Sequence, residues 1–237
     1  MDRSIFVALS GMALQEKRIE ILSDNIANVN TAGYKKQKPL FEDSMPDARG
    51  LRTFAAVSGV VTDMSQGISE KTDRRLDVEI RGDGLFVVNT PNGPRYTRDG
   101  SFVLGSDGSL MTRQGDTVAG DKGVIKLTSP DVDIDPDGNV RNGNFVVGKL
   151  KLVTFDDPGR LVREGSYFAA ADPGVNPKQA GPNTSLNQGY VETSNVNPVR
   201  AMTTMIEAMR SYETHSKMIQ TIDDITRKSI DEIGRAS

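Results

Sequence analysis

The chain has 237 residues, of which 36% are hydrophobic and 26% are charged, and 23 of them are glycine. This composition is typical of a soluble protein of one or two domains with many turns. The net charge of -3, without any cluster of Lys and Arg, argues against a nucleic-acid partner. The absence of cysteine excludes disulfides, thiolate metal ligands and cysteine nucleophiles.

The N-terminus lacks the basic region and the continuous apolar segment of a cleaved signal peptide. No apolar run approaches the roughly 20 residues that a membrane span requires. We therefore expect no transmembrane segment, and an export route, if the protein leaves the cytoplasm, that does not cleave the N-terminus.

A first amphipathic helix is predicted from about Ser4 to Val29, because its apolar residues recur three and four positions apart. The residues of the predicted seam include Ile5, Ala8, Met12, Ile19, Leu22, Ile26 and Val29. Such a helix packs either on its own domain core or against a coiled-coil partner. Asn30, Thr31 and Gly33 then favour turns or left-handed backbone, so the helix should end there.

Residues 34–73 show little periodicity and are interrupted by Pro and Gly, which predicts an extended connection with short strands, one of them from Val57 to Thr62. From Leu76 to about Ala170 short strands alternate with turns, among them Leu76–Ile80 and Leu85–Val88. Five turn pairs suited to positive φ recur between strands: Asn92-Gly93, Asp99-Gly100, Asp107-Gly108, Asp137-Gly138 and Asn142-Gly143. These features predict an all-β central domain.

Residues from about Asp172 to Asn187 are rich in Pro, Gly and Asn and indicate a second connection. Asn197 as N-cap with Pro198 at the first helical position then predicts the start of a second amphipathic helix. The fold class is therefore α+β, a mainly β central domain with N- and C-terminal helices that form a coiled-coil-like assembly domain. The predicted boundaries are 1–30 and 198–237 for the helical domain, 31–75 and 172–197 for the connecting arms, and 76–171 for the β-rich outer domain.

Candidate chemistry is sparse, and we predict no catalytic, cofactor-binding or metal-binding residues. The single histidine, His215, lies in the second helix and is better explained as an exposed or interface residue than as part of a catalytic triad. Asp133 to Asn139 resembles the beginning of a calcium loop, but Asn144 stands where a bidentate Glu is needed, so a hairpin turn is the preferred interpretation. Gly82-Asp83-Gly84 is explained by close backbone packing better than by a phosphate site.

Four segments together resemble the bacterial flagellar rod and hook proteins. Asp24 to Lys35 resembles the signature that closes the first helix of that family, with Ser23-Asp24 as a departure. The other three segments, in chain order, are Gly82–Val88, Tyr96–Phe102 and Gly189–Pro198. Within the family, the Met1-Asp2 opening, the short arm after Tyr34 and the length most resemble a proximal-rod member, with a distal-rod member as the alternative.

The resemblance implies a non-enzymatic structural subunit of the basal-body rod, without cofactor, in which the terminal helices form an inner tube and the β domain faces outward. It also implies export through the flagellar type III apparatus without a cleaved signal peptide, and assembly in the periplasm. The implied partners are other copies of the chain, the export apparatus and neighbouring rod proteins such as FlgB, FlgC and FlgG. The expected interface residues are Ile5, Met12, Ile19, Leu22, Ile26, Met202, Met205, Met209, Tyr212 and Ile219.

Two hinges are expected to join the inner helices to the outer domain. The hinge residues are Asn25, Asn28, Asn30, Gly33, Tyr34, Ser194, Asn195, Asn197 and Pro198. Replacing Gly33 with Val should then damage assembly more than monomer stability. The alternative hypothesis is a self-contained β-rich binding or enzymatic domain whose terminal helices fold back as its core.

Overall fold

The computed structural model describes residues 2–43, 55–143, 145–170 and 174–235. The described chain forms two compact units. The first combines residues 1–27, 37–61 and 197–237, and the second combines residues 28–36 and 62–196. The predicted α+β class, with two long terminal helices and a β-rich centre, is confirmed.

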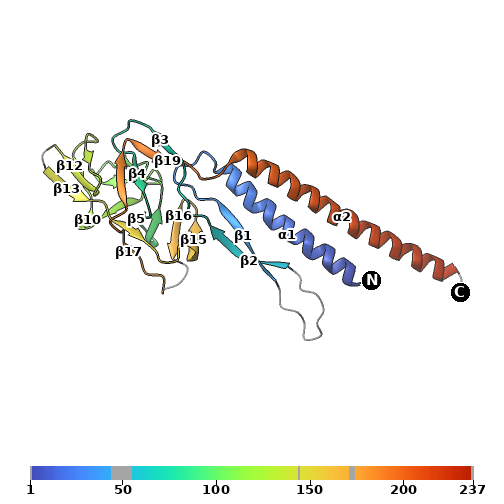
Figure 1. Cartoon of the computed structure of the whole chain (residues 1–237). Coiled ribbons are helices and arrows are strands. Elements are labelled where there is room, and N and C mark those ends of the chain that lie inside the picture. Colours follow the sequence, from blue (N-terminus) through green and yellow to red (C-terminus); the bar gives the residue numbers. More distant parts are fainter. Residues whose placement is uncertain (1, 44–54, 144, 171–173, 236–237) are drawn as a thin grey trace. The chain divides into compact units, whose positions relative to one another are not determined.

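The first unit contains both long helices. Helix α1 (Asp2–Ala27) and helix α2 (Pro198–Arg235) pack side by side and antiparallel, with the two chain ends at the same end of the pair (Figure 1). Strands β1 (Gln37–Asp43) and β2 (Ala55–Thr62) pair with each other, and β1 contacts α1. The predicted strand at 57–62 is therefore present, while residues 44–54 of the same predicted arm lie outside the described residues.

The start of α2 agrees with the predicted cap. The Oδ1 atom of Asn197 accepts a hydrogen bond of 2.9 Å from the backbone N–H of Arg200, and Pro198 occupies the first helical position. Helix α1 ends at Ala27, and the N–H of Thr31 then donates to the carbonyl of Asn28 at 3.2 Å. Both ends therefore follow local capping and turn chemistry.

The second unit is built from short strands. They are β3 (Ser69–Lys71), β4 (Val78–Arg81), β5 (Leu85–Thr90), β6 (Gly93–Thr97), β7 (Val103–Leu104), β8 (Leu110–Met111), β9 (Thr117–Gly120), β10 (Gly123–Val124), β11 (Asp133–Ile134), β12 (Asn139–Asn142), β13 (Phe145–Lys149), β14 (Leu152–Thr154), β15 (Leu161–Glu164), β16 (Tyr167–Ala170), β17 (Lys178–Gln179), β18 (Ser185–Gln188) and β19 (Tyr190–Glu192), with a 3-10 turn η1 (Pro158–Arg160) before β15. Residues 144 and 171–173 lie outside the described residues.

The strands of the second unit pair antiparallel. The main sheet follows the order β15-β16-β6-β5-β9-β8-β7, with β10 added beside β9, and β14 joins it through β5 and carries β17. Smaller sheets are β11-β12-β13, β18-β4 and β19-β3. Strand β18, from the region predicted as the second arm, thus pairs with β4 near the start of the domain.

Two apolar clusters form the core of the second unit. The larger is centred on Phe86 and Phe102, whose rings meet edge to face at 5.0 Å. The smaller contains Tyr96 and Phe155, whose ring centroids are 4.8 Å apart in the same arrangement. This part of the chain therefore has a hydrophobic core built from its own strands.

Four of the five predicted turn pairs place their glycine at positive φ: Gly93, Gly108, Gly138 and Gly143. Gly100 is the exception, because its φ is not in the left-handed region. A Cβ there would lie 1.8 Å from the carbonyl oxygen of Val78, so this glycine serves close backbone packing. The loop at Asp133 to Asn139 is the turn of the β11–β12 hairpin, with Ile134 opposite Val140.

The strand predicted at Leu76–Ile80 differs in its burial. Strand β4 starts at Val78, and although polar and apolar residues alternate in this segment, the side chain of the polar Glu79 is only 1% exposed. Its carboxylate accepts hydrogen bonds from Ser69 Oγ at 2.6 Å and from Gln66 Nε2 at 3.4 Å. The segment at 66–69 therefore covers the polar side of β4, which local alternation does not reveal.

Candidate functional site

Small residues line the contact between α1 and α2. Ala8 in α1 and Ala201 and Ala208 in α2 are buried. At Gly11 an added Cβ would lie only 2.7 Å from Cε1 of His215, so the imidazole ring lies directly against the glycine. Because helix separation depends on side-chain size at the contact, these residues let the two helices approach closely.

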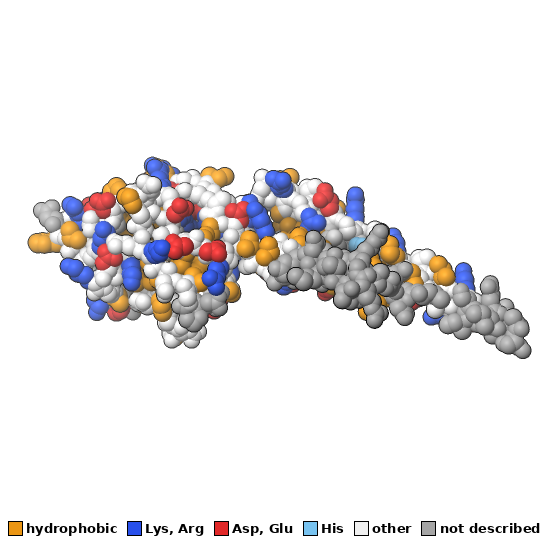
Figure 2. All heavy atoms as spheres, turned by 60° about the horizontal axis from the view of Figure 1, so that its bottom comes forward, with side chains coloured by type: hydrophobic (Ala, Val, Ile, Leu, Met, Phe, Trp, Pro, Cys, Tyr) orange, Lys and Arg blue, Asp and Glu red, His pale blue; other side chains and the backbone are white. Residues whose placement is uncertain are grey.

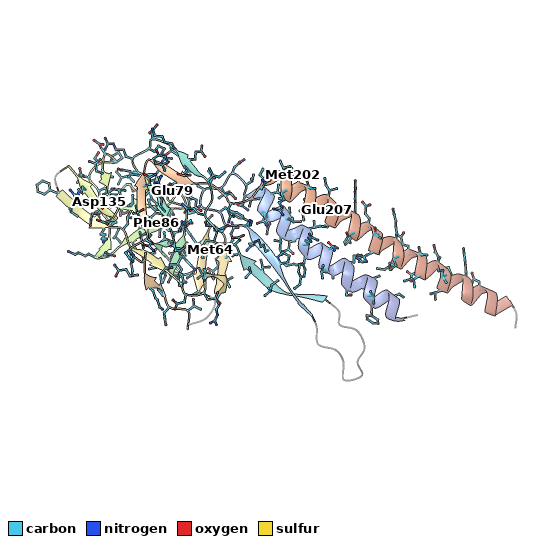
Figure 3. All side chains as sticks on the ribbon, viewed as in Figure 1. Met64, Glu79, Phe86, Asp135, Met202 and Glu207 are labelled. Atoms are coloured by element: carbon cyan, nitrogen blue, oxygen red, sulfur yellow. The ribbon has the colours of Figure 1, made fainter. Side chains whose placement is uncertain are left out.

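The residues predicted as assembly interface fall into two groups. Eight of them are half-buried on the helix pair: Ile5, Met12, Ile19, Leu22, Ile26, Met205, Tyr212 and Ile219. The other two, Met202 and Met209, are exposed. Met202 lies on the side of α2 that is turned away from α1 (Figure 3). The half-buried group is therefore partly covered within the chain itself, while Met202 and Met209 are left exposed.

Helix α2 carries a second apolar stripe, which we call the outer stripe. It consists of Val199, Met202, Ile206 and Met209, spaced three, four and three residues apart, so the four side chains share one face. Their exposed fractions run from 44% at Met209 to 73% at Val199. Contiguous exposed apolar side chains of this kind mark interaction surfaces.

Helix α1 adds exposed apolar residues near its N-terminus: Phe6, Val7 and Leu9. Helix α2 has 38 residues against 26 in α1, so its C-terminal part extends beyond its partner. Exposed Ile225 lies in that part. Among the described helices, none combines the length and the apolar character needed to cross a membrane.

Two buried polar atoms of the first unit have no hydrogen-bond partner among the described residues. They are Oε1 of Gln15 in α1 and Nδ1 of His215 in α2. His215 is thus a residue of the helix contact, in agreement with the interface interpretation. Unpaired polar groups in a helix seam cost stability but restrict the register in which two helices fit.

The hinge residues of the first unit tie β1 to α1. Buried Asn25 donates from Nδ2 to the carbonyl of Gln37 at 2.8 Å, and its Oδ1 accepts from the N–H of Gln37 at 2.8 Å. One asparagine side chain thereby satisfies both backbone groups of the residue that starts β1. These two hydrogen bonds hold the end of α1 at Asn25 to the start of β1 at Gln37.

The hinge residues of the second unit also form a compact cluster of contacts. The N–H of Gly33 donates to the carbonyl of Glu192 at 2.7 Å, and the N–H of Asn195 donates to the carbonyl of Tyr34 at 3.3 Å. Oδ1 of Asn195 accepts from the N–H of Lys36 at 2.7 Å. The guanidinium of Arg163 lies 3.9 Å from the centre of the Tyr34 ring.

Gly33 has φ of +69° and packs against backbone. A Cβ at this position would lie 2.2 Å from the backbone N of Asp99 and 2.5 Å from the carbonyl carbon of Arg98. A side chain here would therefore strain the second unit itself. That replacing Gly33 with Val damages assembly more than monomer stability stays a prediction, to which this geometry adds a cost in the monomer.

The remaining hinge residues make local contacts. Oδ1 of Asn28 accepts from Oγ1 of Thr31 at 3.3 Å, and Oγ of Ser194 accepts from the N–H of Val196 at 3.3 Å. Asn30 is exposed. The predicted hinge therefore combines tightly held residues with at least one that faces solvent.

A buried charge cluster is the feature that sequence reasoning missed. Glu192 accepts from Nζ of Lys35 at 2.5 Å, from Nε of Arg98 at 2.6 Å and from the N–H of Gly67 at 2.7 Å. The guanidinium of Arg98 also donates to the carbonyls of Ile80 and Gly82, at 2.9 and 2.7 Å. The side chain of Glu192 is fully buried.

The electrostatics of this cluster follow from two cations around one anion. Burial raises the pKa of Glu192, but the charges of Arg98 and Lys35 outweigh that effect and hold the pKa below its usual value. Burial lowers the pKa of Lys35, and the Glu192 charge offsets only part of this decrease. The cluster thus strongly favours the Glu192 carboxylate.

The cluster joins all four segments that carried the family resemblance. Lys35 closes the first, Gly82 opens the second, Arg98 lies in the third and Glu192 in the fourth. The opposite charges of residues inside these motifs are a signal from which the pairing could have been predicted. However, Lys35 and Glu192 are 157 positions apart in the sequence, so no local pattern connects them.

The acidic loop at the β11–β12 hairpin is explained by local hydrogen bonds. Oδ1 of Asp135 accepts from the N–H groups of Asp137 and Asn139, at 3.1 and 2.9 Å. Asp133 pairs with Arg75 at 2.8 Å. Within the described ranges, no three His, Asp or Glu side chains gather as metal ligands would. The geometry supports turn formation at this loop.

Three family models match separate parts of the chain. They are described as flagella basal body rod protein, over residues 5–35; flagellar hook protein FlgE/F/G D1 domain, over residues 79–142; and flagellar basal body rod FlgEFG protein C-terminal, over residues 187–232. The matched regions cover α1 with its following turn, a large part of the β-rich unit, and α2 with the segment before it.

Individual proteins match over nearly their whole length. The chain is 32% identical to the flagellar basal-body rod protein FlgF of Caulobacter vibrioides over 99% of both chains, and 31% identical to FlgF of Mesorhizobium japonicum over 100% of both. It is 33% identical to the flagellar basal-body rod protein FlgG of Buchnera aphidicola subsp. Schizaphis graminum, over 96% of this chain and 98% of the relative.

Proposed function

The chain belongs to the FlgE/F/G family of flagellar basal-body rod proteins and is a structural, non-enzymatic rod subunit similar to FlgF; from this premise we propose that it assembles into the axial drive shaft through its terminal helices. In this proposal the α1–α2 pair is the assembly element that transmits motor torque along the rod. The β-rich unit faces outward from it. Full-length membership favours this role over the self-contained binding domain.

The outer stripe carries the proposal. Val199, Met202, Ile206 and Met209 share one exposed face of α2, while the small residues Ala201 and Ala208 already bury the face toward α1. A helix with two apolar faces satisfies one contact within its own chain and leaves the other for a neighbour. The predicted residues Met202 and Met209 then serve contacts between subunits, and half-buried residues such as Ile19 and Ile219 support the pair.

The neighbours and the location are also part of the proposal. We assign contacts to other copies of the chain and to the rod proteins FlgB, FlgC and FlgG. The rod assembles in the periplasm after passage through the flagellar type III apparatus without a cleaved signal peptide. The similarity to FlgF supports a proximal position in the rod, with a distal position as the alternative.

Imaging basal bodies from a strain that lacks this chain tests the proposal. We expect a non-motile strain whose rod stops at a proximal layer, with motility restored by the wild-type gene on a plasmid. A rod that stops at a distal layer would exchange the proximal role for the distal one. Complete rods and normal motility without the chain would rule out the proposed function.

A further inference from the structure

A cavity in the second unit lies where the smaller apolar cluster meets the buried charge cluster. Its volume is about 260 Å³, just below the roughly 300–1,000 Å³ of typical small-molecule sites, so a ligand that fills it is small. Leu85, Val153 and Phe155 of the apolar cluster contribute to the wall. Lys35 and Arg98 of the charge cluster also contribute to it. The cavity wall is therefore both apolar and cationic.

The apolar part of the wall comes from paired strands. Val153 of β14 lies opposite Leu85 of β5, and both side chains are buried. Phe155 follows β14 and packs edge to face on Tyr96. Met64 packs against the same cluster and also lines the cavity. Because strand pairing and ring packing hold these side chains in place, this part of the wall is formed before any ligand binds.

The cationic part of the wall has hydrogen-bond donors to spare. An ammonium has three N–H groups, and among the described residues Lys35 meets two acceptors, Glu192 and the carbonyl of Ser65. A guanidinium has five N–H groups, and within the same residues Arg98 meets four acceptors. Its Nη1 atom donates to the carbonyl of Gly84, which itself lines the cavity. Each cation can therefore donate once more.

The two cations share one buried carboxylate. Glu192 pairs with both Lys35 and Arg98, so the three groups together carry one excess positive charge. Burial lowers the pKa of Lys35, and the Glu192 charge offsets only part of this decrease. A second anion beside Lys35 would be attracted by the same charge. Figure 2 shows acidic and basic side chains mixed over one face of the second unit, so an anion would be attracted by the local cluster more than by that surface.

Two further carboxylates at the cavity do not cancel this excess. Asp156 forms an ion pair with Lys178 at 2.7 Å, and its side chain is 75% exposed. Asp83 is also exposed, whereas the side chains of Lys35 and Arg98 are only 1% and 5% exposed. Water and salt screen exposed charges far more than buried ones. The buried cations therefore decide which charge the interior of the cavity favours.

We propose that this cavity binds a small molecule that carries one carboxylate on an apolar body. The carboxylate accepts the remaining N–H groups of Lys35 and Arg98, and the apolar body lies against Leu85, Val153 and Phe155. Charge-assisted hydrogen bonds of this kind are stronger where an apolar wall excludes water. All of these residues belong to the second unit, so the site is independent of the helix contacts of the proposed function.

Calorimetric titration of the full-length chain tests the site with probes that differ in one feature each. Hexanoate has both the carboxylate and the apolar body, 1-hexanol lacks the charge, hexylamine reverses it, and acetate lacks the chain. We expect hexanoate to bind saturably at one site per chain. Each of the other three should bind at least about tenfold more weakly, because a charge-assisted hydrogen bond and several buried CH₂ groups each contribute that factor.

Methyl NMR of the methionine-labelled wild-type chain tests where hexanoate binds. The methyl signal of Met64, identified by its loss in Met64→Leu, should shift as hexanoate is added, because Met64 lines the cavity. The signal of Met202, exposed on α2, is the internal control and should stay in place. This measurement is made on the natural chain, so it does not depend on the folding of any variant.

Substitution of a single lysine tests the role of the excess charge. Lys35→Met leaves Arg98 and Glu192 balanced, so it should weaken hexanoate binding at least about tenfold and leave the weak binding of 1-hexanol unchanged. The matched control is Lys36→Met, because Lys36 pairs with Asp63 at 3.2 Å, away from the cavity wall. The control should bind hexanoate as the wild type does.

Four results would overturn the proposal. Equal affinity for hexanoate and hexylamine would show that the exposed Asp83 and Asp156 select the charge of the ligand. Equal affinity for hexanoate and acetate would indicate an adventitious ion only. Saturable binding that leaves the Met64 methyl signal in place would assign hexanoate to another surface. No binding of hexanoate up to about 10 mM would show that the cavity takes no ligand of this class. None of these results bears on the rod function.

Discussion

Lys35, which follows the turn after α1, forms a buried ion pair with Glu192, which precedes α2, with 2.5 Å between Nζ and Oε1. The two residues are 157 positions apart in the sequence. Arg98 shares the same carboxylate. In the second unit, one buried carboxylate is therefore paired with two cations. Removing the carboxylate and removing one of the cations should change the free energy of unfolding by different amounts.

Removing Glu192 should cost more than removing Lys35. Glu192→Gln leaves two buried cations without a counter-ion, and we expect a loss of about 3–5 kcal/mol in the free energy of unfolding. Lys35→Met leaves the Arg98–Glu192 pair balanced, so we expect a smaller loss of about 1–3 kcal/mol. Urea unfolding of the full-length variants measures both, and a greater loss for Lys35→Met would contradict the two-cation account.

The same carboxylate predicts the acid dependence of stability. Because the pKa of Glu192 is lowered in the folded state, its stabilisation is complete above its unfolded pKa of about 4.3 and is lost as the pH falls through the lower folded value. Unfolding midpoints measured below about pH 4.3 should fall more steeply for wild type than for Glu192→Gln. Parallel acid limbs in the two proteins would show that another group dominates.

The opposite end of the pH range involves Lys35. Its pKa is lowered in the folded state, chiefly by burial, so the unfolded chain binds the proton more tightly. Stability contributed at this residue should rise as the pH increases from the folded pKa towards the unfolded value of about 10.4. Lys35→Met should remove this rise from the pH dependence of the unfolding free energy, and an unchanged alkaline profile would argue against it.

Gly33→Ala should destabilise the monomer by about 2–4 kcal/mol. The left-handed backbone costs a non-glycine residue about 1–2 kcal/mol, and the clash with the Asp99 backbone adds overpacking. Gly165→Ala is the matched control, because Gly165 has a similar φ of +62° but nothing within 4 Å of an added Cβ. Thermal unfolding should show a larger loss at Gly33. Equal losses would mean that the backbone angle alone decides.

Gly11 and His215 should be energetically coupled. Gly→Ala in a helix interior gains about 1 kcal/mol from helix propensity, but in the wild-type background the new Cβ meets the His215 ring at 2.7 Å. The substitution should therefore stabilise the helix pair more when His215→Ala is already present. Hydrogen exchange of amides in residues 2–27 measures this double-mutant cycle. Additive effects would show that the ring does not press on Gly11.

The sequence predicted elements whose causes are local. The cap by Asn197 and Pro198 and the strand at 57–62 follow from neighbouring residues, and the structure contains them. The contact face of α2 could not be read in the same way, because pattern analysis weights large apolar residues. Instead, the buried residues of α2 include Ala201 and Ala208, and the His215 ring of α2 lies against Gly11 of α1.

The ion cluster was beyond prediction for a different reason. Lys35, Arg98 and Glu192 meet only because strand topology brings three distant segments together, and no periodicity encodes that meeting. The burial of Glu79 depends on a nearer segment, because Ser69, ten residues before it in the sequence, covers it. Local patterns thus predicted the elements, while the contacts between them required the structure.

The central claim is that the outer stripe of α2 makes subunit contacts and does not stabilise the monomer. The most direct test is the copy number of Met202→Asp/Ile206→Asp in purified basal bodies, with Glu207→Lys, exposed on another face of α2, as control. We predict an unchanged unfolding midpoint for the double variant and a copy number at least about tenfold lower, the effect of ~1.4 kcal/mol of lost contact energy. Incorporation at the wild-type level would contradict the account.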